Sequence, residues 1–137
     1  MKKIMFVCHG NICRSPMAKY IFKSLTNDFH VESRATSREE IGNDIYPPIK
    51  KVLDNHNIPY DRHYATQITK EEFDSYDYIY AFDDNNMYNL ERMFGDISKV
   101  KLMSDTEIDD PWYTRDFERA YQETYEACKK ILESIKD

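Results

Sequence analysis

Short uninterrupted apolar runs alternate along this 137-residue chain with stretches in which apolar residues recur at helical spacing. The apolar runs predict buried strands over 4–8, 30–36, 77–82 and 100–103. The helical spacing predicts helices over 16–25, over 48–56, after the capping residues 83–86, and over 117–135. Residues 37–48, which carry charges, a glycine and two prolines, are expected to form a loop.

Strands that alternate with helices favour an α/β fold. We expect a single domain over 1–137, built on a four-stranded parallel sheet with helices on both faces. The length suits one hydrophobic core and is too short for two. In such sheets ligands bind beyond the carboxyl ends of the strands, so the segment that follows the strand over 4–8 is the first place to look for a site.

The composition and net charge limit the kinds of molecule that the protein is expected to bind. Hydrophobic residues make up 41% and charged residues 32% of the chain, as in an ordinary globular protein, and the net charge is −6. This charge argues against a general binder of nucleic acid or of anionic membranes. Three cysteines, with no leader sequence and no run of membrane-spanning length, favour free thiols and a cytoplasmic location.

The segment after the first strand has the pattern Cys-x5-Arg-Ser, from Cys8 to Arg14 and Ser15. A loop between a strand and a helix directs several backbone N–H groups at one point, which favours an anion. A thiol there is expected to ionise, and an arginine can hold a phosphate through two parallel hydrogen bonds. The pattern therefore predicts a cysteine-dependent phosphatase site. The alternative is a buried cysteine and an incidental arginine in an ordinary turn.

A second motif supplies a carboxyl group. Breaking a phosphate ester with a thiolate requires a proton for the departing oxygen and then a base that activates water. Asp110, within the sequence DDPWY of residues 109–113, is the best candidate for both steps. The neighbouring Trp112 and Tyr113 are suited to flanking an aryl substrate. Taken without the cysteine loop, an Asp-Pro pair is an ordinary turn signal.

Residues 7–18 (VCHGNICRSPMA) and 110–113 (DPWY) together give the chain a family resemblance. In both motifs, and in their order, it resembles the low-molecular-weight protein tyrosine phosphatases. The resemblance implies a flavodoxin-like parallel sheet and a two-step reaction through a cysteinyl phosphate, with no metal and no cofactor. By position, Cys8 is then the nucleophile, Arg14 the phosphate clamp and Asp110 the general acid and base.

The resemblance also assigns supporting residues. Asn11, Ser15 and Ser33 are expected to hold the loop and to support the thiolate by hydrogen bonds. His63 and Asp83 are expected to form a structural pair. The remaining expected contacts of the phosphate and the aryl ring are His9, Gly10, Ile12, Cys13, Trp112 and Tyr113.

Three positions depart from the family pattern: His9, Arg34 and Glu39 stand where an apolar or threonine side chain, a glycine and an aromatic side chain are usual. These departures bear on substrate preference. With Glu39, Glu40 and Asp109 expected at the rim of the pocket, we predict a modest preference for basic residues beside the phosphotyrosine.

The expected substrates are phosphotyrosine-containing proteins or peptides and aryl phosphates, with phosphate-like oxyanions as inhibitors. A related branch that dephosphorylates arginine carries threonine where this chain has Ile12. Arsenate reductases on this fold need two more redox cysteines, whereas only Cys128 lies downstream, on an apolar helix stripe. A phosphotyrosine-binding or redox-sensing module is a third alternative, although binding alone needs neither Cys8 nor Asp110. Cys13 is expected to be a redox partner of Cys8.

Overall fold

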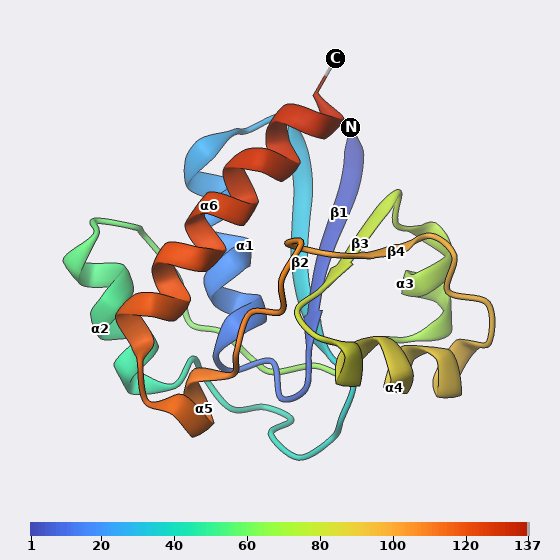
Figure 1. The fold of residues 1–137 in the computed structure, drawn as a ribbon, viewed down its shortest axis with the longest axis horizontal. Coiled ribbons are helices and arrows are strands. Elements are labelled where there is room, and N and C mark those ends of the chain that lie inside the picture. Colours follow the sequence, from blue (N-terminus) through green and yellow to red (C-terminus); the bar gives the residue numbers. More distant parts are fainter. Residues whose placement is uncertain (137) are drawn as a thin grey trace.

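The computed structural model describes residues 1–136 and contains a four-stranded parallel sheet of order β2-β1-β3-β4 (Figure 1). The strands are β1 (Lys2–Cys8), β2 (Phe29–Ala35), β3 (Tyr78–Ala81) and β4 (Val100–Leu102). Strand β1 pairs with both β2 and β3, with Cys8 opposite Ala35 at its carboxyl end. This confirms the predicted fold class.

Helices cover both faces of the sheet (Figure 1). On one face lie α1 (Arg14–Leu25), α2 (Pro47–Asn55) and α6 (Phe117–Ile135), and on the other lie α3 (Lys70–Ser75) and α4 (Asp84–Phe94). A short helix, α5 (Pro111–Thr114), lies at the lower edge in Figure 1, near the loop that joins β1 to α1. This edge is where the carboxyl end of β1 lies, so the fold brings both sequence motifs to one end of the sheet.

The central strand β1 explains why its sequence is apolar without interruption. Side chains alternate between the two faces of a strand, and both faces are covered here. Ile4 and Phe6 pack in the core beneath α1 and α6, whereas Met5 and Val7 pack in the smaller core beneath α3 and α4. All four side chains are fully buried. Strand β1 is thereby held from both sides up to Cys8.

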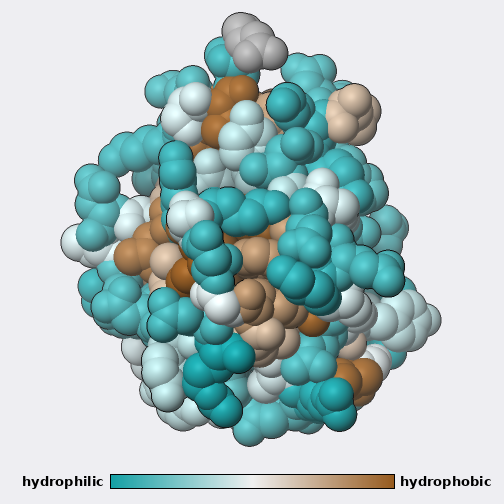
Figure 2. Space-filling view, turned by 90° about the vertical axis from the view of Figure 1, so that its right-hand side faces the viewer, coloured by the Kyte–Doolittle hydropathy of each residue, from teal (hydrophilic) through white to brown (hydrophobic). Residues whose placement is uncertain are grey.

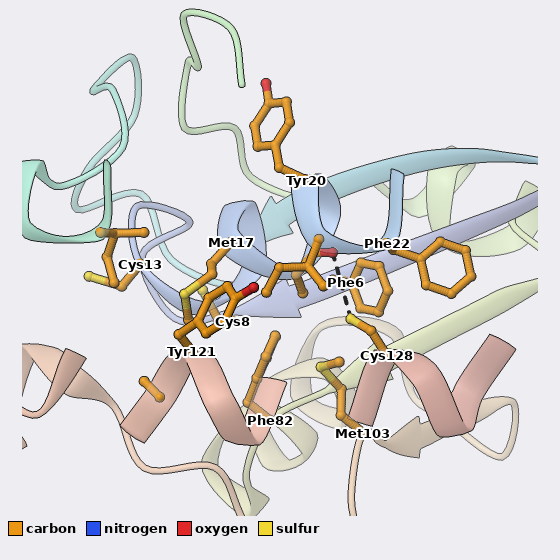
Figure 3. Close-up of a cluster of buried hydrophobic side chains, with 14 of the residues drawn as sticks. Phe6, Cys8, Cys13, Met17, Tyr20, Phe22, Phe82, Met103, Tyr121 and Cys128 are labelled. Atoms are coloured by element: carbon orange, nitrogen blue, oxygen red, sulfur yellow. Dashed lines mark hydrogen bonds between the residues drawn. The ribbon is translucent and has the colours of Figure 1, made fainter. Parts of the chain in front are cut away.

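The core between β1, α1 and α6 is aromatic and contains the third cysteine (Figure 3). The rings of Phe6 and Phe22 lie 5.8 Å apart. The Sγ atom of Cys128 on α6 lies 3.8 Å from the carbonyl oxygen of Ala18 on α1. Burial raises the pKa of the Cys128 thiol, which keeps it neutral. Cys128 is thus a core residue, as predicted.

Two short helices were not predicted. Helix α3 begins with a capping box, in which the Thr69 hydroxyl accepts from the Glu72 backbone N–H and the Glu72 carboxylate accepts from the Thr69 N–H, both at 3.1 Å. Helix α5 is a single turn that starts at the predicted Asp-Pro turn. Both are too short for an apolar stripe, so hydrophobic periodicity does not reveal them.

A groove of about 680 Å³ lies between the β3–β4 side of the sheet and α6. Figure 2 views the molecule from the side of β4 and shows hydrophobic side chains gathered at the centre of this face among hydrophilic ones. Ile108 lines the groove.

Across residues 1–136, no helix is both long and apolar enough to cross a membrane.

Candidate active site

The loop between β1 and α1 turns its carbonyl groups away from its own interior. The carbonyl oxygens of Cys8 and His9 accept hydrogen bonds from the backbone N–H groups of Thr36 and Ser37, at 2.9 and 3.1 Å. The Ile12 carbonyl accepts from the Tyr46 N–H at 2.9 Å. In a trans peptide the carbonyl and the next N–H point in opposite directions. The amides that follow these carbonyls are therefore directed inward, toward a shared anion site.

Asn11 holds the centre of this loop. Its backbone has the left-handed φ of 61°, a conformation that asparagine tolerates better than most residues, and the residue is fully buried. Its side-chain amide donates to the hydroxyls of Ser15 and Ser33 at 2.7 and 3.0 Å. Its side-chain carbonyl accepts from the Thr66 N–H at 3.0 Å. The predicted loop-supporting residues Asn11, Ser15 and Ser33 are therefore in direct contact.

The thiol of Cys8 faces two groups that can donate hydrogen bonds. Its Sγ atom lies 3.0 Å from the Ser15 hydroxyl and 3.3 Å from the Asn11 backbone N–H. Cys8 is only 3% exposed. Hydrogen bonds donated to a sulfur stabilise its negative form, as a thiolate nucleophile requires.

Arg14, at the start of α1, is almost completely buried at 2% exposure. Its Nη1 donates to the Asp83 carboxylate and to the Ile108 carbonyl, both at 2.8 Å, and its Nη2 lies 3.6 Å from the Asp110 carboxylate. Burial alone would lower the pKa of Arg14, but Cys8, Asp110 and Asp83 outweigh it and raise that pKa. A permanent positive charge is thus fixed beside the thiol.

The segment before α5 is held by hydrogen bonds of both its backbone and its side chains. Ile108 donates its N–H to the Phe82 carbonyl at 3.0 Å, while its own carbonyl accepts from Arg14. The Asp84 N–H donates to the Glu107 carboxylate at 2.5 Å. Asp110 then caps α5 by accepting from the Trp112 N–H at 3.0 Å, and its second oxygen faces Arg14. These bonds bring Asp110 to the cysteine loop.

A cavity of about 370 Å³ joins the two motifs. Its lining consists of Cys8, His9, Gly10, Ile12, Cys13, Arg14, Glu39, Glu40, Asp110, Trp112 and Tyr113. The residues predicted to contact the phosphate and the aryl ring therefore share one cavity. Asp109, which was expected at the rim, lines a different depression beside α6 instead. Ser33 and Asn11 are hydrogen-bonded to each other and do not line the cavity, so they support its loop.

The predicted pairing of His63 with Asp83 was wrong. His63 donates from Nε2 to the Asn11 carbonyl at 2.6 Å, and its backbone N–H donates to the Asp44 carboxylate at 3.0 Å. Asp83 instead accepts from Arg14 and, at 2.8 Å, from the Asn86 N–H as the cap of α4. Each side chain supports a different part of the site. Burial lowers the pKa of His63 against the opposing effect of the Asn11 carbonyl, so its ring is neutral.

All three departures from the family pattern have identifiable partners. Arg34 does not line the cavity and forms an ion pair with Glu72 at 2.7 Å. His9 and Glu39 both line the cavity and are hydrogen-bonded to each other through Nε2 and a carboxylate oxygen. Arg34 is thus part of the scaffold, whereas His9 and Glu39 form part of the cavity wall.

Several supporting groups could not be found by sequence reasoning. Ile108 and Thr66 act through their backbone atoms, which leave no residue-type signal. Asp44 positions His63, and it accepts from Lys50 as well. Burial would raise the pKa of Asp44, but bonds from Lys50 and from backbone N–H groups lower it. A lone aspartate in a loop gives no sequence signal for this role.

Comparison with known proteins identifies the class of this site. The family model described as "Low molecular weight phosphotyrosine protein phosphatase" matches residues 3–137, so the chain belongs to that family. The human low molecular weight phosphotyrosine protein phosphatase is 38% identical over 96% of this chain and 94% of its own length. The protein is therefore a protein tyrosine phosphatase of the low-molecular-weight class, as the sequence motifs predicted.

Solved structures extend this likeness to the fold. SP-PTP, a low molecular weight protein tyrosine phosphatase from Streptococcus pyogenes, has a TM-score of 0.96 and 41% identity, covering 100% of this chain and 95% of its own. A Drosophila arginine phosphatase has a TM-score of 0.89 and 29% identity, covering 100% and 99%. Proteins of similar fold thus differ in substrate. Within residues 1–136, no cluster of three or more His, Cys, Asp or Glu side chains could hold a metal ion.

Replacing Asn11 tests the strain in the loop. Asn11→Ala and Asn11→Gly both remove the side-chain hydrogen bonds, but only the alanine side chain is strained by the left-handed φ. We expect Asn11→Ala to have a free energy of unfolding about 1 kcal/mol below that of Asn11→Gly. Urea denaturation of the two variants measures the difference. Equal stabilities would show that the backbone conformation is not constrained.

The lowered pKa of His63 predicts a pH-dependent stability. The unfolded chain takes up a proton near the ordinary histidine pKa of about 6.5, whereas the folded protein resists it. The contribution is therefore present at neutral pH and is lost as the pH falls through the unfolded pKa toward the folded one. Denaturation at pH 7.5 and at about pH 5.5 should show a larger loss of stability in the wild type than in His63→Gln. A parallel loss in both proteins would contradict this assignment.

Proposed function

We propose that residues 1–137 act as a single phosphatase domain that hydrolyses phosphotyrosine on proteins through a phosphate ester of Cys8. The observation that carries this proposal is that Cys8, Arg14 and Asp110 line one cavity of about 370 Å³. A nucleophile, a fixed positive charge and a carboxyl group are the three elements that such a reaction needs.

In the first step the Cys8 thiolate attacks phosphorus and the bond to the tyrosine oxygen breaks. The inward amides of the loop and the guanidinium of Arg14 hold the equatorial oxygens, on which negative charge is spread in the transition state. Asp110, protonated for this step, gives its proton to the departing phenolic oxygen. This proposed role of Asp110 is supported by the 3.6 Å distance between its carboxylate and Nη2 of Arg14, which holds the phosphate.

In the second step water attacks the phosphocysteine and the thiolate leaves. Asp110, now ionised, accepts a proton from that water. The Ser15 hydroxyl, 3.0 Å from Sγ, donates to the sulfur as its negative charge returns. The reaction ends with inorganic phosphate in the loop. Related oxyanions are therefore expected to inhibit by occupying the same cradle.

The proposed substrate class follows from the walls of the cavity. Trp112 and Tyr113 line its mouth and are suited to flanking a phenyl ring, whereas the shorter phosphoserine would not extend to Cys8. Ile12 offers a guanidinium no hydrogen-bond partner, which favours phosphotyrosine over phosphoarginine. Cys128 lies buried between α1 and α6, which disfavours the role of a mobile reductase cysteine.

We assign no metal or other cofactor to the reaction, because the thiolate and Asp110 account for both chemical steps. Aryl phosphates are expected to serve as artificial substrates. The three cysteines are free thiols, in keeping with a cytoplasmic location. We expect no nucleic-acid or membrane partner, since the net charge is −6.

The role of Asp110 is tested by varying the leaving group. General acid catalysis typically contributes about 10²–10⁴-fold, and it matters most for a strongly basic leaving oxygen. Asp110→Asn should therefore slow the hydrolysis of phenyl phosphate far more than that of p-nitrophenyl phosphate. The matched control is Asp109→Asn, which lies outside the cavity and should leave both rates near those of the wild type. An equal loss for both substrates would assign Asp110 a structural role.

Cys13 is proposed to protect Cys8 from irreversible oxidation. Both thiols line the same cavity. Peroxide converts the Cys8 thiolate into a sulfenic acid, and attack by Cys13 then forms a disulfide and releases water. Burial raises the pKa of Cys13, and the nearby charge of Cys8 raises it further. Because the thiolate is the attacking form, disulfide formation should be faster at higher pH.

Mass spectrometry after mild peroxide treatment should find a Cys8–Cys13 disulfide, with activity restored by a dithiol. The Cys13→Ser variant is the control, since it should pass directly to the irreversible sulfinic acid. Sulfinic acid at Cys8 as the sole product in the wild type would refute the protective role.

A further inference from the structure

Two glutamates form an acidic wall of the cavity. Glu39 and Glu40 both line it, and among residues 1–136 neither forms an ion pair with a lysine or arginine. The Glu40 carboxylate accepts from the Asn43 side-chain amide at 2.7 Å. The Glu40 stem lies over the cysteine loop, since a Cβ atom added to Gly10 would meet its Cγ at 3.5 Å. The acidic wall therefore adjoins the site of the phosphate.

The carboxylate of Glu39 is bound by His9 instead of by a cation from elsewhere in the fold. Ser37 fixes the two partners, because its N–H and hydroxyl both bind the His9 carbonyl and its hydroxyl also accepts from the Glu39 N–H at 3.4 Å. The His9 side chain is 38% exposed and the Glu39 side chain is 68% exposed. This hydrogen bond therefore lies at the mouth of the cavity, within reach of a substrate.

The electrostatics of the wall favour one kind of substrate. A phosphate dianion approaching Glu39 and Glu40 is repelled by both carboxylates. A cationic side chain next to the phosphotyrosine offsets this repulsion and gains an attraction of its own. His9 competes with such a side chain for the same carboxylate, since Nε2 already occupies one oxygen of Glu39.

We infer that the His9–Glu39 pair sets the substrate preference: a lysine or arginine beside the phosphotyrosine displaces His9 from Glu39 and takes its place. The inference rests on the proposed function, whose substrate class it narrows to phosphotyrosine with a basic neighbour. His9 weakens the preference by competing for Glu39, and Glu39 creates it.

A double-mutant cycle tests the competition. The wild type, His9→Leu, Glu39→Gln and the double variant are compared by the ratio of kcat/KM for two phosphotyrosine peptides, one with lysine and one with glutamate neighbours. The ratio cancels any general loss of rate. At low salt we expect a ratio above one in the wild type and a rise of about two- to fivefold in His9→Leu, as suits an exposed ion pair.

The ratio should fall toward one in Glu39→Gln, where only Glu40 remains of the acidic wall, and should be the same in the double variant, since His9 then has no Glu39 carboxylate to mask. High salt should reduce the wild-type ratio toward one. The matched control is Glu91→Gln on α4, which changes the net charge equally outside the cavity and should leave the ratio at its wild-type value.

An unchanged ratio in His9→Leu would overturn the competition. A lysine preference as large in the double variant as in the wild type would overturn the role of Glu39, as would a wild-type preference for glutamate neighbours. In each of these outcomes both peptides are still hydrolysed, so the proposed function stands. If the wild type hydrolyses neither peptide, the proposed function fails and this inference fails with it.

Discussion

The left-handed turn at Asn11 is the constraint on which the site depends. Reversing the backbone at this residue allows the loop carbonyls to bind the surrounding segments while the amides face one point. The turn is held on all sides, because the Asn11 carbonyl is bound by His63 and its side chain by Ser15, Ser33 and Thr66. Four residues from three separate parts of the chain thus fix one residue, and through it the position of the Cys8 thiol.

A buried arginine connects this loop to the segment that carries Asp110. A guanidinium with 2% exposure would be costly without partners. Asp83 and the Ile108 carbonyl supply these partners. Asp83 follows strand β3, and Ile108 lies in the segment that follows strand β4. The same contacts restrain the chain that leads to Asp110. The buried charge of Arg14 therefore also positions Asp110, which explains why motifs far apart in sequence meet in one cavity.

The extent to which sequence could predict this structure differs between its parts. Strand β1 and helix α6 were predictable because both are governed by local apolar periodicity. Cys8, Arg14 and Asp110 could be chosen as candidates because the proposed chemistry requires these residue types, and the structure places all three on one cavity. The partners of His63 were not, since they are a backbone carbonyl and a loop carboxylate brought together by the fold. The placement of Asp109 outside the cavity depends on the orientation of a single turn of helix, which periodicity does not encode.

The central claim is that the loop makes the Sγ atom of Cys8 the acceptor of the phosphoryl group. The direct measurement is to mix the enzyme with a phosphotyrosine peptide, quench the reaction within one turnover and locate the added phosphate by peptide mass spectrometry. The account predicts phosphate on the sulfur of Cys8, in larger amounts in Asp110→Asn supplied with a good leaving group, because the hydrolysis of the intermediate is then slowed. Turnover without a phosphorylated Cys8, or phosphate found on Ser15 or Cys13 instead, would contradict it.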